Sequence, residues 1–350
     1  MTLPPDAVSI RRPSRTARVI HAVAGALTQP AVRFVTSTRG RPVGERLAAA
    51  GRTVRKLSRL QRVRPIGGIQ FARYSHDDVP IEMIRTAQSR ASLSDGVIFY
   101  LHGGGFFCGN LDSHLHVVVA LARRTQVPVV HVDYRQHPDT RIDGSIQDCL
   151  SAYRWLLEQG ADPEKVVFAG DSAGGFLAFA TVLAAQQDGL PTPAGVVGIS
   201  PLLELDNTAR NTHENVTRDP LRAGPALTVV LECTRPDSTM FDPSPVSGSL
   251  EAFPPALIIV AESEILRCDA ERMYETLTRA GRSCTVRAWT HQLHAFPALL
   301  PFLPESKEAF DCIVQFIRTR LSASTSADRS RQDAPGCRTT AHSCVSHSME

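Results

Sequence analysis

Ser172 stands in a setting that suits a nucleophile. It is the central serine of the hexapeptide at 170–175, Gly-Asp-Ser-Ala-Gly-Gly. Its glycines fill the G-x-S-x-G pattern, in which a serine sits on a tight turn between a strand and a helix with its hydroxyl exposed above a sheet. Glycine is needed on both sides because a Cβ there would clash with the neighbouring strand and helix. The hexapeptide therefore predicts a serine able to attack an electrophilic carbon; an ordinary strand–turn–helix connection is the competing interpretation.

A second glycine-rich segment, His102-Gly103-Gly104-Gly105, precedes the serine in the chain. Consecutive glycines leave backbone N–H groups sterically open to an incoming oxygen, and this arrangement supplies oxyanion-hole donors in acyl transfer. We expect the N–H groups of Gly104, Gly105 and Ala173 to form such a hole. A flexible glycine turn would explain the segment alone, but not its combination with the serine hexapeptide.

Alternating strand-like and helix-like runs flank both motifs. The β-branched run 165–169 predicts a buried parallel strand before the serine, and the small apolar run 176–185 predicts a helix after it. The alternation continues to about residue 321, which predicts the α/β class with one mostly parallel sheet and helices on both faces. The other predicted strands are 97–101, 127–132, 195–199, 256–260 and 284–288, with two edge strands at 66–75 and 79–86. The other predicted helices are 16–36 (broken at Pro30), 43–62, 115–124, 144–157, 268–280 and 306–321.

Several stretches together resemble the hormone-sensitive-lipase-like family of α/β-hydrolases, over roughly residues 65–321. The resemblance is carried by His102-Gly103-Gly104-Gly105-Phe106, Val132-Asp133-Tyr134-Arg135, Asp162-Pro163, the hexapeptide at 170–175, Ser200-Pro201 and His294-Ala295-Phe296. It implies the α/β-hydrolase fold with a helical cap, and a serine carboxylesterase or lipase with no metal or organic cofactor. His102 and Asp171 are then expected to hold the two glycine loops in place.

Three segments follow from this resemblance and from composition. Residues 1–64 are basic and partly disordered, and are expected to contribute to the cap. Residues 65–321 form the catalytic domain, with a polar, irregular cap insertion at about 206–240. Residues 322–350 contain almost no large apolar side chains. They cannot bury enough surface to offset chain entropy, which predicts a disordered tail.

A serine hydroxyl needs a general base, and the base needs an acid that fixes its tautomer. In α/β-hydrolases the chain order is serine, acid, histidine. His294 follows the predicted strand 284–288 on a loop, in the His-x-Phe setting of the family, and is the expected base. His291 lies three residues earlier and is the rival.

The acid departs from the family pattern. Relatives usually have Asp where this chain has Glu264, two residues before Leu266. Glutamate also accepts from an imidazole, with one more methylene of reach. Asp269 is the second candidate, since it begins a predicted helix, where it could instead cap the helix or lie on the surface. Glu262 is the third and is expected to point the opposite way at the strand end.

The net charge of +3 is unevenly spread along the chain. Residues 1–64 hold fourteen Arg and Lys against Asp6 and Glu45, a balance of +12 (fourteen minus two), so the remainder carries −9. This asymmetry favours either a solvated helical face or peripheral contact with an anionic membrane. Nothing in residues 65–321 resembles a nucleic-acid-binding motif, and a homodimer is left open.

Composition also bears on the compartment. Hydrophobic residues make up 43% of the chain, enough for a sizeable core, but no apolar run reaches the 18 or so residues of a spanning helix. The eight cysteines form no C-x-x-C pair, so neither a zinc site nor a redox motif is indicated. Reduced thiols in a cytoplasmic protein are the expectation, with membrane association left open.

These features predict a serine carboxylesterase that hydrolyses short- to medium-chain acyl esters through an acyl-enzyme intermediate. The alternatives are a true lipase or a deacetylase using the same triad, and a hydrolase-fold protein that binds a ligand without turnover. Phe106, Phe107 and Phe176 lie beside the two glycine motifs. They predict an apolar substrate pocket, unless they are simply core residues.

Overall fold

The computed structural model describes residues 13–37, 42–62, 67–89, 92–236 and 242–332, which contain one eight-stranded sheet. The strands are β1 Ile69–His76, β2 Val79–Thr86, β3 Val97–Leu101, β4 Val129–Val132, β5 Val166–Asp171, β6 Gly195–Ile199, β7 Ala256–Ala261 and β8 Cys284–Trp289. Their order is β1-β2-β4-β3-β5-β6-β7-β8. The β2 strand pairs antiparallel with both β1 and β4, and all other pairs are parallel. The predicted α/β class with a mostly parallel sheet is confirmed.

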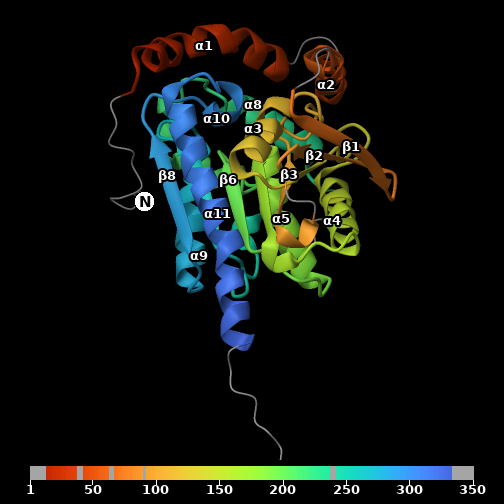
Figure 1. The fold of residues 1–350 in the computed structure, drawn as a ribbon. Helices are drawn as coiled ribbons and strands as arrows, with labels where there is room; N and C mark the ends of the chain where they lie inside the picture. The colour runs from red at the N-terminus through yellow and green to blue at the C-terminus, as the bar shows by residue number, and fades with distance from the viewer. Residues whose placement is uncertain (1–12, 38–41, 63–66, 90–91, 237–241, 333–350) are drawn as a thin grey trace, which may run out of the picture.

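Helices cover both faces of the sheet (Figure 1). The long ones are α3 Leu115–Thr125, α4 Ile142–Glu158, α5 Ala173–Gln187, α9 Arg267–Arg279 and α11 Pro304–Gln332. Helices α4, α5 and α9 share one core with Phe99 and Phe168, whereas α3 and α11 share the other with Ile98 and Val167. Adjacent residues of a strand point to opposite faces, so both sets are buried and the central strands are apolar throughout.

Five shorter or peripheral helices lie towards the carboxyl ends of the parallel strands. They are α1 Arg15–Thr36, α2 Val43–Ser58, α6 Thr208–Thr212, α7 Asn215–Arg218 and α8 Gly224–Thr234. In Figure 1, α1 crosses the top of the molecule and α2 lies beside it; both pack on α8. Helices from the start of the chain and from the insertion therefore come together over one end of the sheet. No helix in the described ranges is long and apolar enough to cross a bilayer.

Helix α2 approaches the catalytic body through a glycine. A Cβ on Gly51 would lie 2.0 Å from the carbonyl oxygen of Phe107, far inside van der Waals contact. At the end of the same helix, the Ser58 hydroxyl donates to Asn110 Oδ1 over 3.0 Å. These two contacts fix α2 on the loop that follows the glycine segment at 103–105.

Gly51→Ala should therefore lower the free energy of unfolding by about 1–3 kcal/mol, because the added methyl must push α2 away from its loop. Urea unfolding followed by circular dichroism measures this. Gly224→Ala is the matched control, since its added Cβ meets nothing within 4 Å, and it should change stability by less than about 1 kcal/mol. An equal loss in both variants would contradict a close contact specific to Gly51.

The prediction of an irregular insertion at 206–240 is wrong, because α6, α7 and α8 lie within it. Pro225 occupies the first turn of α8, where its missing N–H would have no helical partner. A proline of this insertion therefore lies in the first turn of a helix. Pro30 likewise lies inside α1 without ending it.

Two further boundaries differ from the predictions. The β2 strand is not at the edge, because it pairs with β4 as well as with β1. The helix expected to end at 321 continues to Gln332, since residues 322–332 contain no Gly or Pro and include good helix formers such as Ala, Arg and Gln. The remainder of the predicted tail, 333–350, and residues 1–12 lie outside the described residues.

Candidate active site

Ser172 lies on the turn between β5 and α5. Its φ of +54° is positive, which is uncommon for a residue other than glycine and is often found at functional turns. Helix α5 begins against the end of β3, where a Cβ on Gly174 would lie 2.1 Å from the carbonyl oxygen of Leu101. The glycines of the hexapeptide thus allow the tight crossing, and Ser172 is left partly exposed at the carboxyl end of β5.

His294 and Glu264 form a hydrogen-bonded chain with Ser172. His294 lies on the loop between β8 and α10 Phe296–Leu299. Its Nε2 is 2.9 Å from Ser172 Oγ, and its Nδ1 is 2.6 Å from Glu264 Oε2. A carboxylate can only accept, so Nδ1 carries the proton and Nε2 is free to accept from the serine hydroxyl. The structure thus brings together the three residues selected from the sequence.

A network around Glu264 fixes its carboxylate. Glu264 is 1% exposed, and its Oε1 accepts from the N–H of Ala261 at 2.8 Å and from the Ser200 hydroxyl at 2.7 Å. Ser200 Oγ in turn accepts from the N–H of Ala295, the residue after the base, at 2.9 Å. One hydroxyl therefore couples the acid to the loop that carries His294. Ser200 is part of the Ser200-Pro201 match to the family, but no role in the site was predicted for it from the sequence.

The surroundings of His294 raise its pKa above the ordinary value of 6.5. Burial is the largest influence and acts in the opposite direction, because it penalises the imidazolium. The hydrogen bond and the charge of Glu264 together outweigh burial, and Asp219 and Asp171 add to their effect. The site therefore stabilises the imidazolium that forms when His294 accepts a proton.

Asp269 lies in a different network. It is 1% exposed, and both its oxygens are 2.7 Å from Nη1 of Arg210. Its Oδ2 also accepts from the N–H groups of Leu203 and Glu204. The interpretation of Asp269 as a helix cap or a surface charge is wrong, because it is the buried partner of an arginine. Its carboxylate fixes the chain that follows β6.

The remaining rivals make other contacts. Glu262 Oε1 lies 3.4 Å from the guanidinium of Arg218. His291 is exposed, and its ring centroid is 5.2 Å from that of His21 on α1. Neither arrangement gives these side chains a part in the chain of hydrogen bonds from Ser172.

The glycine segment after β3 has the backbone that an oxyanion hole requires. Gly104 and Gly105 have φ values of +126° and +61°, and a Cβ on Gly104 would lie 1.7 Å from the carbonyl oxygen of Cys108. In the described part of the chain, the N–H groups of both glycines donate to no carbonyl. Ala173 is the first residue of α5, so its N–H has no partner within the helix. Three N–H groups are thus open near the serine turn.

Asp171 ties the two glycine segments together. Its Oδ1 accepts from the Tyr100 hydroxyl at 2.7 Å and from the N–H of Gly103 at 3.0 Å, and its Oδ2 is 3.2 Å from His114 Nε2. Burial would raise the pKa of Asp171, but the charge of His114 and these hydrogen bonds hold it far below its usual range. Asp171 is therefore an anionic clamp between the serine turn and the glycine loop.

His102 supports the same loop through contacts of its ring and its carbonyl with Tyr134. Its ring stacks on that of Tyr134 with centroids 4.4 Å apart, and the Tyr134 hydroxyl donates to the His102 carbonyl at 2.6 Å. Tyr134 belongs to the Val-Asp-Tyr-Arg stretch at 132–135. The match of this stretch to the family could have indicated the supporting role of Tyr134, but no role was predicted for Tyr134 from the sequence.

The three phenylalanines beside the glycine motifs differ in exposure. Phe106 and Phe176 are 2% and 0% exposed, and their rings meet edge to face with centroids 5.6 Å apart. They are core residues. Phe107 is partly exposed, and its ring lies close to Gly105, where an added Cβ would be 2.9 Å from Cε1. Only Phe107 of the three is placed to meet a substrate.

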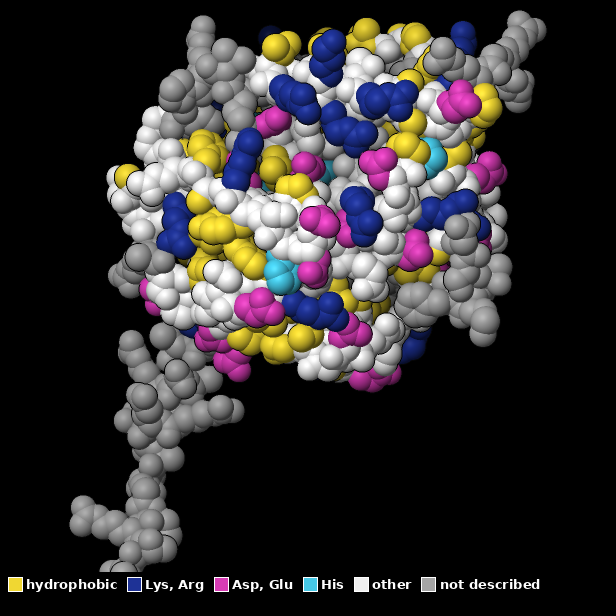
Figure 2. All heavy atoms as spheres, turned by 90° about the vertical axis from the view of Figure 1, so that its right-hand side faces the viewer, with side chains coloured by type: hydrophobic (Ala, Val, Ile, Leu, Met, Phe, Trp, Pro, Cys, Tyr) yellow, Lys and Arg dark blue, Asp and Glu magenta, His cyan; other side chains and the backbone are white. Residues whose placement is uncertain are grey.

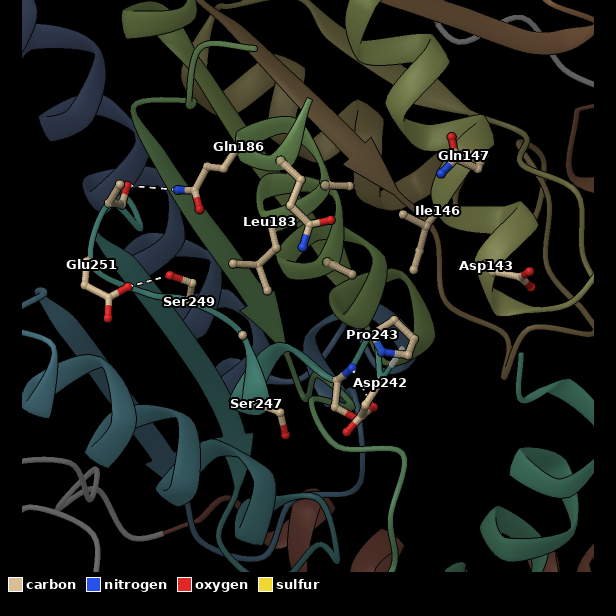
Figure 3. Close-up of a pocket in the computed structure, with 16 residues that line it drawn as sticks. Asp143, Ile146, Gln147, Leu183, Gln186, Asp242, Pro243, Ser247, Ser249 and Glu251 are labelled. Carbon is tan, nitrogen blue, oxygen red and sulfur yellow. Dashed lines mark hydrogen bonds between the residues drawn. The ribbon is translucent and has the colours of Figure 1, made fainter. Parts of the chain in front are cut away.

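Cavities lie at several places around the catalytic body. One, of about 510 Å³, lies between α1 and the segment around α7; its lining includes His21, Gly25, Gln29, Arg218, Asp219 and Arg222. It lies on the triad's side of the molecule, because His21 in its lining is 3.2 Å from the hydroxyl of Ser263, the residue before Glu264. Another, of about 580 Å³, lies between α4, α5 and residues 242–252 and includes no triad residue (Figure 3). The described residues contain no group of three or more His, Cys, Asp or Glu that could hold a metal ion.

The chain is similar in sequence to known hydrolases. A family profile described as alpha/beta hydrolase fold matches residues 98–298. The chain is 36% identical over 256 residues to the carboxylesterase/phospholipase LipF of Mycobacterium tuberculosis, covering 70% of this chain and 68% of that protein. It is 34% identical over 238 residues to an acetyl-hydrolase of Streptomyces hygroscopicus, covering 66% and 78% of the two chains.

Solved structures give a similar result. The crystal structure of an esterase from the bacterial hormone-sensitive lipase family superposes with a TM-score of 0.70 at 28% identity, covering 84% of this chain and 98% of that one.

Proposed function

This chain belongs to the hormone-sensitive-lipase-like family of α/β-hydrolases and is a carboxylic ester hydrolase, and we propose that it cleaves short- to medium-chain acyl esters through an acyl-enzyme on Ser172. The observation that carries the proposal is the hydrogen-bonded chain from Ser172 through His294 to Glu264. A base that can accept from a serine, beside open N–H groups, is suited to acyl transfer.

In the first half-reaction, Ser172 Oγ attacks the ester carbonyl carbon while His294 Nε2 takes the hydroxyl proton. The carbonyl oxygen becomes an oxyanion, which the N–H groups of Gly104, Gly105 and Ala173 stabilise by about 3–4 kcal/mol per donor. When the tetrahedral intermediate collapses, the bond to the alcohol oxygen breaks and His294 gives its proton to that oxygen. The acyl group is then bound to Ser172.

The second half-reaction repeats these steps with water. His294 Nε2 takes a proton from the water as its oxygen attacks the acyl carbon, and the proton returns to Ser172 Oγ as the acid leaves. Glu264 stays ionised throughout, because it acts by fixing the tautomer and stabilising the imidazolium. Ser200 keeps Glu264 and the histidine loop in register through its two hydrogen bonds.

Two observations support a substrate of modest size. The cavity between α1 and α7 is lined by charged, amide and small side chains such as Arg218, Asp219 and Gln29, and not by a long apolar wall. One relative is named an acetyl-hydrolase. A long acyl chain gains binding free energy only where a long apolar surface removes it from water, so we favour an esterase over a true lipase.

A series of p-nitrophenyl esters tests this preference. We expect kcat/KM to be highest for acyl chains of about two to eight carbons, and to show no jump at the concentration where the ester forms micelles. A maximum at long chains together with interfacial activation would assign the protein to the true lipases instead.

The pH dependence should follow His294. Only the neutral imidazole can accept the serine proton, so kcat/KM should rise with pH as His294 deprotonates and level off above its pKa. Because Glu264 raises this pKa, the midpoint should lie above 6.5. In Glu264→Gln both the charge and the acceptor carboxylate are lost, and NMR titration of His294 should give a lower pKa. An unchanged pKa in that variant would contradict the contact.

A further inference from the structure

Exposed apolar side chains line the outward face of α1. Val19, Val23 and Leu27 follow one another at intervals of four residues and are 62%, 43% and 74% exposed. Residues at this spacing lie on one face of a helix, and Phe34 extends the row at 54% exposure. The apolar side chains of a surface helix ordinarily face the core, whereas α1 exposes this apolar row to solvent.

The inward face of α1 is already packed. Ala17 and Ala24 are 1% and 3% exposed, a Cβ on Gly25 would lie 2.8 Å from the carbonyl oxygen of Pro220, and His21 Nε2 is 3.2 Å from Ser263 Oγ. Small residues allow the helix to lie close to the body. The outward row therefore remains exposed after α1 has docked, and no other described residue covers it.

Helix α2, which contacts α1, and the turn after it, η1 Arg59–Arg62, also expose apolar side chains. Val54, Leu57 and Leu60 are 39%, 59% and 68% exposed. Contiguous exposed apolar side chains of this kind mark sites that bind proteins or membranes.

Cations surround these apolar side chains. The exposed ones are Arg15, Arg18 and Arg33 on α1, and Arg52, Lys56 and Arg59 on α2 and η1. None of them takes part in an ion pair with another described residue. Helix α1 has no acidic residue, and α2 has only Glu45. In Figure 2, Lys and Arg side chains gather towards the top of the molecule, the end that carries α1 and α2 in Figure 1, with hydrophobic side chains along its edge.

We propose that the outward face of α1, α2 and η1 binds an anionic phospholipid surface and seats the protein on it peripherally. Apolar side chains beside cations that form no ion pair with another described residue match the two attractions that hold a helix in the interface of an anionic membrane. A protein partner would need acidic groups spaced to meet six cations over two helices, whereas a lipid surface supplies negative charge everywhere. The bound membrane would lie beside the carboxyl ends of the strands, where Ser172 is.

Co-sedimentation of the full chain with vesicles tests this. The probes are vesicles of phosphatidylcholine alone, and of phosphatidylcholine with an equal amount of phosphatidylglycerol. We expect binding to the anionic vesicles, with a steep loss between about 0.05 and 0.5 M salt, because salt screens exposed charges. Each cation near an anionic surface contributes about fivefold to binding, so the double variant R18E R33E should lower the partition at least about 25-fold.

Two further variants test the apolar contribution to membrane binding and the position of the charges that contribute to it. Leu27→Asp removes an apolar group from the centre of the row and should lower the partition about tenfold or more. Arg279→Glu, at the C-terminus of α9 and the opposite end of the sheet, is a charge-reversal control away from the proposed face and should bind as wild type does. Hydrolysis of a soluble ester should be unchanged in all three, which separates membrane binding from the proposed function.

Two results would overturn the proposal. The first is equal binding to neutral and anionic vesicles, or binding to neither. The second is a dimer in sedimentation velocity that Leu27→Asp dissociates, without vesicle binding by the wild type, which would assign this face to a second copy of the chain.

Discussion

Ser172→Ala is expected to lower kcat for ester hydrolysis about a million-fold, the loss typical when the nucleophile of a serine triad is removed. The methyl group cannot form the acyl-enzyme, so only binding and the oxyanion hole remain to assist water. The fold should be unaffected, because alanine and serine adopt a φ of +54° with similar strain and, among the described residues, Ser172 Oγ bonds only to His294. The measurement is kcat on a short p-nitrophenyl ester.

Labelling with a fluorophosphonate gives a second readout that does not depend on the substrate. In the wild type, Ser172 Oγ should displace fluoride from phosphorus and retain the probe. Ser172→Ala should remain unlabelled, whereas Ser249→Ala, whose hydroxyl donates to Glu251 beside the other cavity, should be labelled as the wild type is. Activity and labelling at wild-type levels in Ser172→Ala would show that another residue is the nucleophile.

The central sheet could be predicted because its strands are covered on both faces. A strand of this kind is encoded as an unbroken apolar run, and β3 and β6 begin and end where the runs 97–101 and 195–199 do. The insertion gave no such signal. Helix α8 is held partly by burial of Leu231 against the body, and this contact depends on chain segments far away in the sequence.

The candidate site likewise has a part that could be predicted from the local sequence and a part that could not. The serine turn and the glycine loop have local geometry, so residues next to each other in the chain encode them. The choice of acid depends on distant partners: Ser200 lies 64 residues before Glu264, and Arg210 lies 59 residues before Asp269. Two carboxylates only five positions apart therefore enter different networks, and no local pattern distinguishes them.

Because Glu264 and Asp269 lie in different networks, substitutions of these two residues test the site most sharply. Glu264→Gln should lower kcat about 10⁴-fold, because an amide in place of the carboxylate can hold His294 in the wrong tautomer and no longer stabilises the imidazolium. The variant should fold, since glutamine keeps the side-chain length and can still accept from Ser200 and Ala261. Glu264→Asp should be milder than Glu264→Gln, because the charge stays and only reach is lost.

Asp269→Asn should have the opposite effect. It leaves Arg210, which is about 2% exposed, without its counter-charge, and breaking a buried ion pair in this way costs about 3–5 kcal/mol of stability. The folded fraction should still turn over near the wild-type rate once active sites are counted by fluorophosphonate titration, because Asp269 makes no contact with His294 among the described residues. Urea unfolding and kcat per titrated site, measured on both variants, thus give inverse orders: Glu264→Gln stable and inactive, Asp269→Asn unstable and active. If Asp269→Asn were folded and inactive while Glu264→Gln kept its activity, the acid would be Asp269, and the short bond between Glu264 and His294 would have no catalytic role.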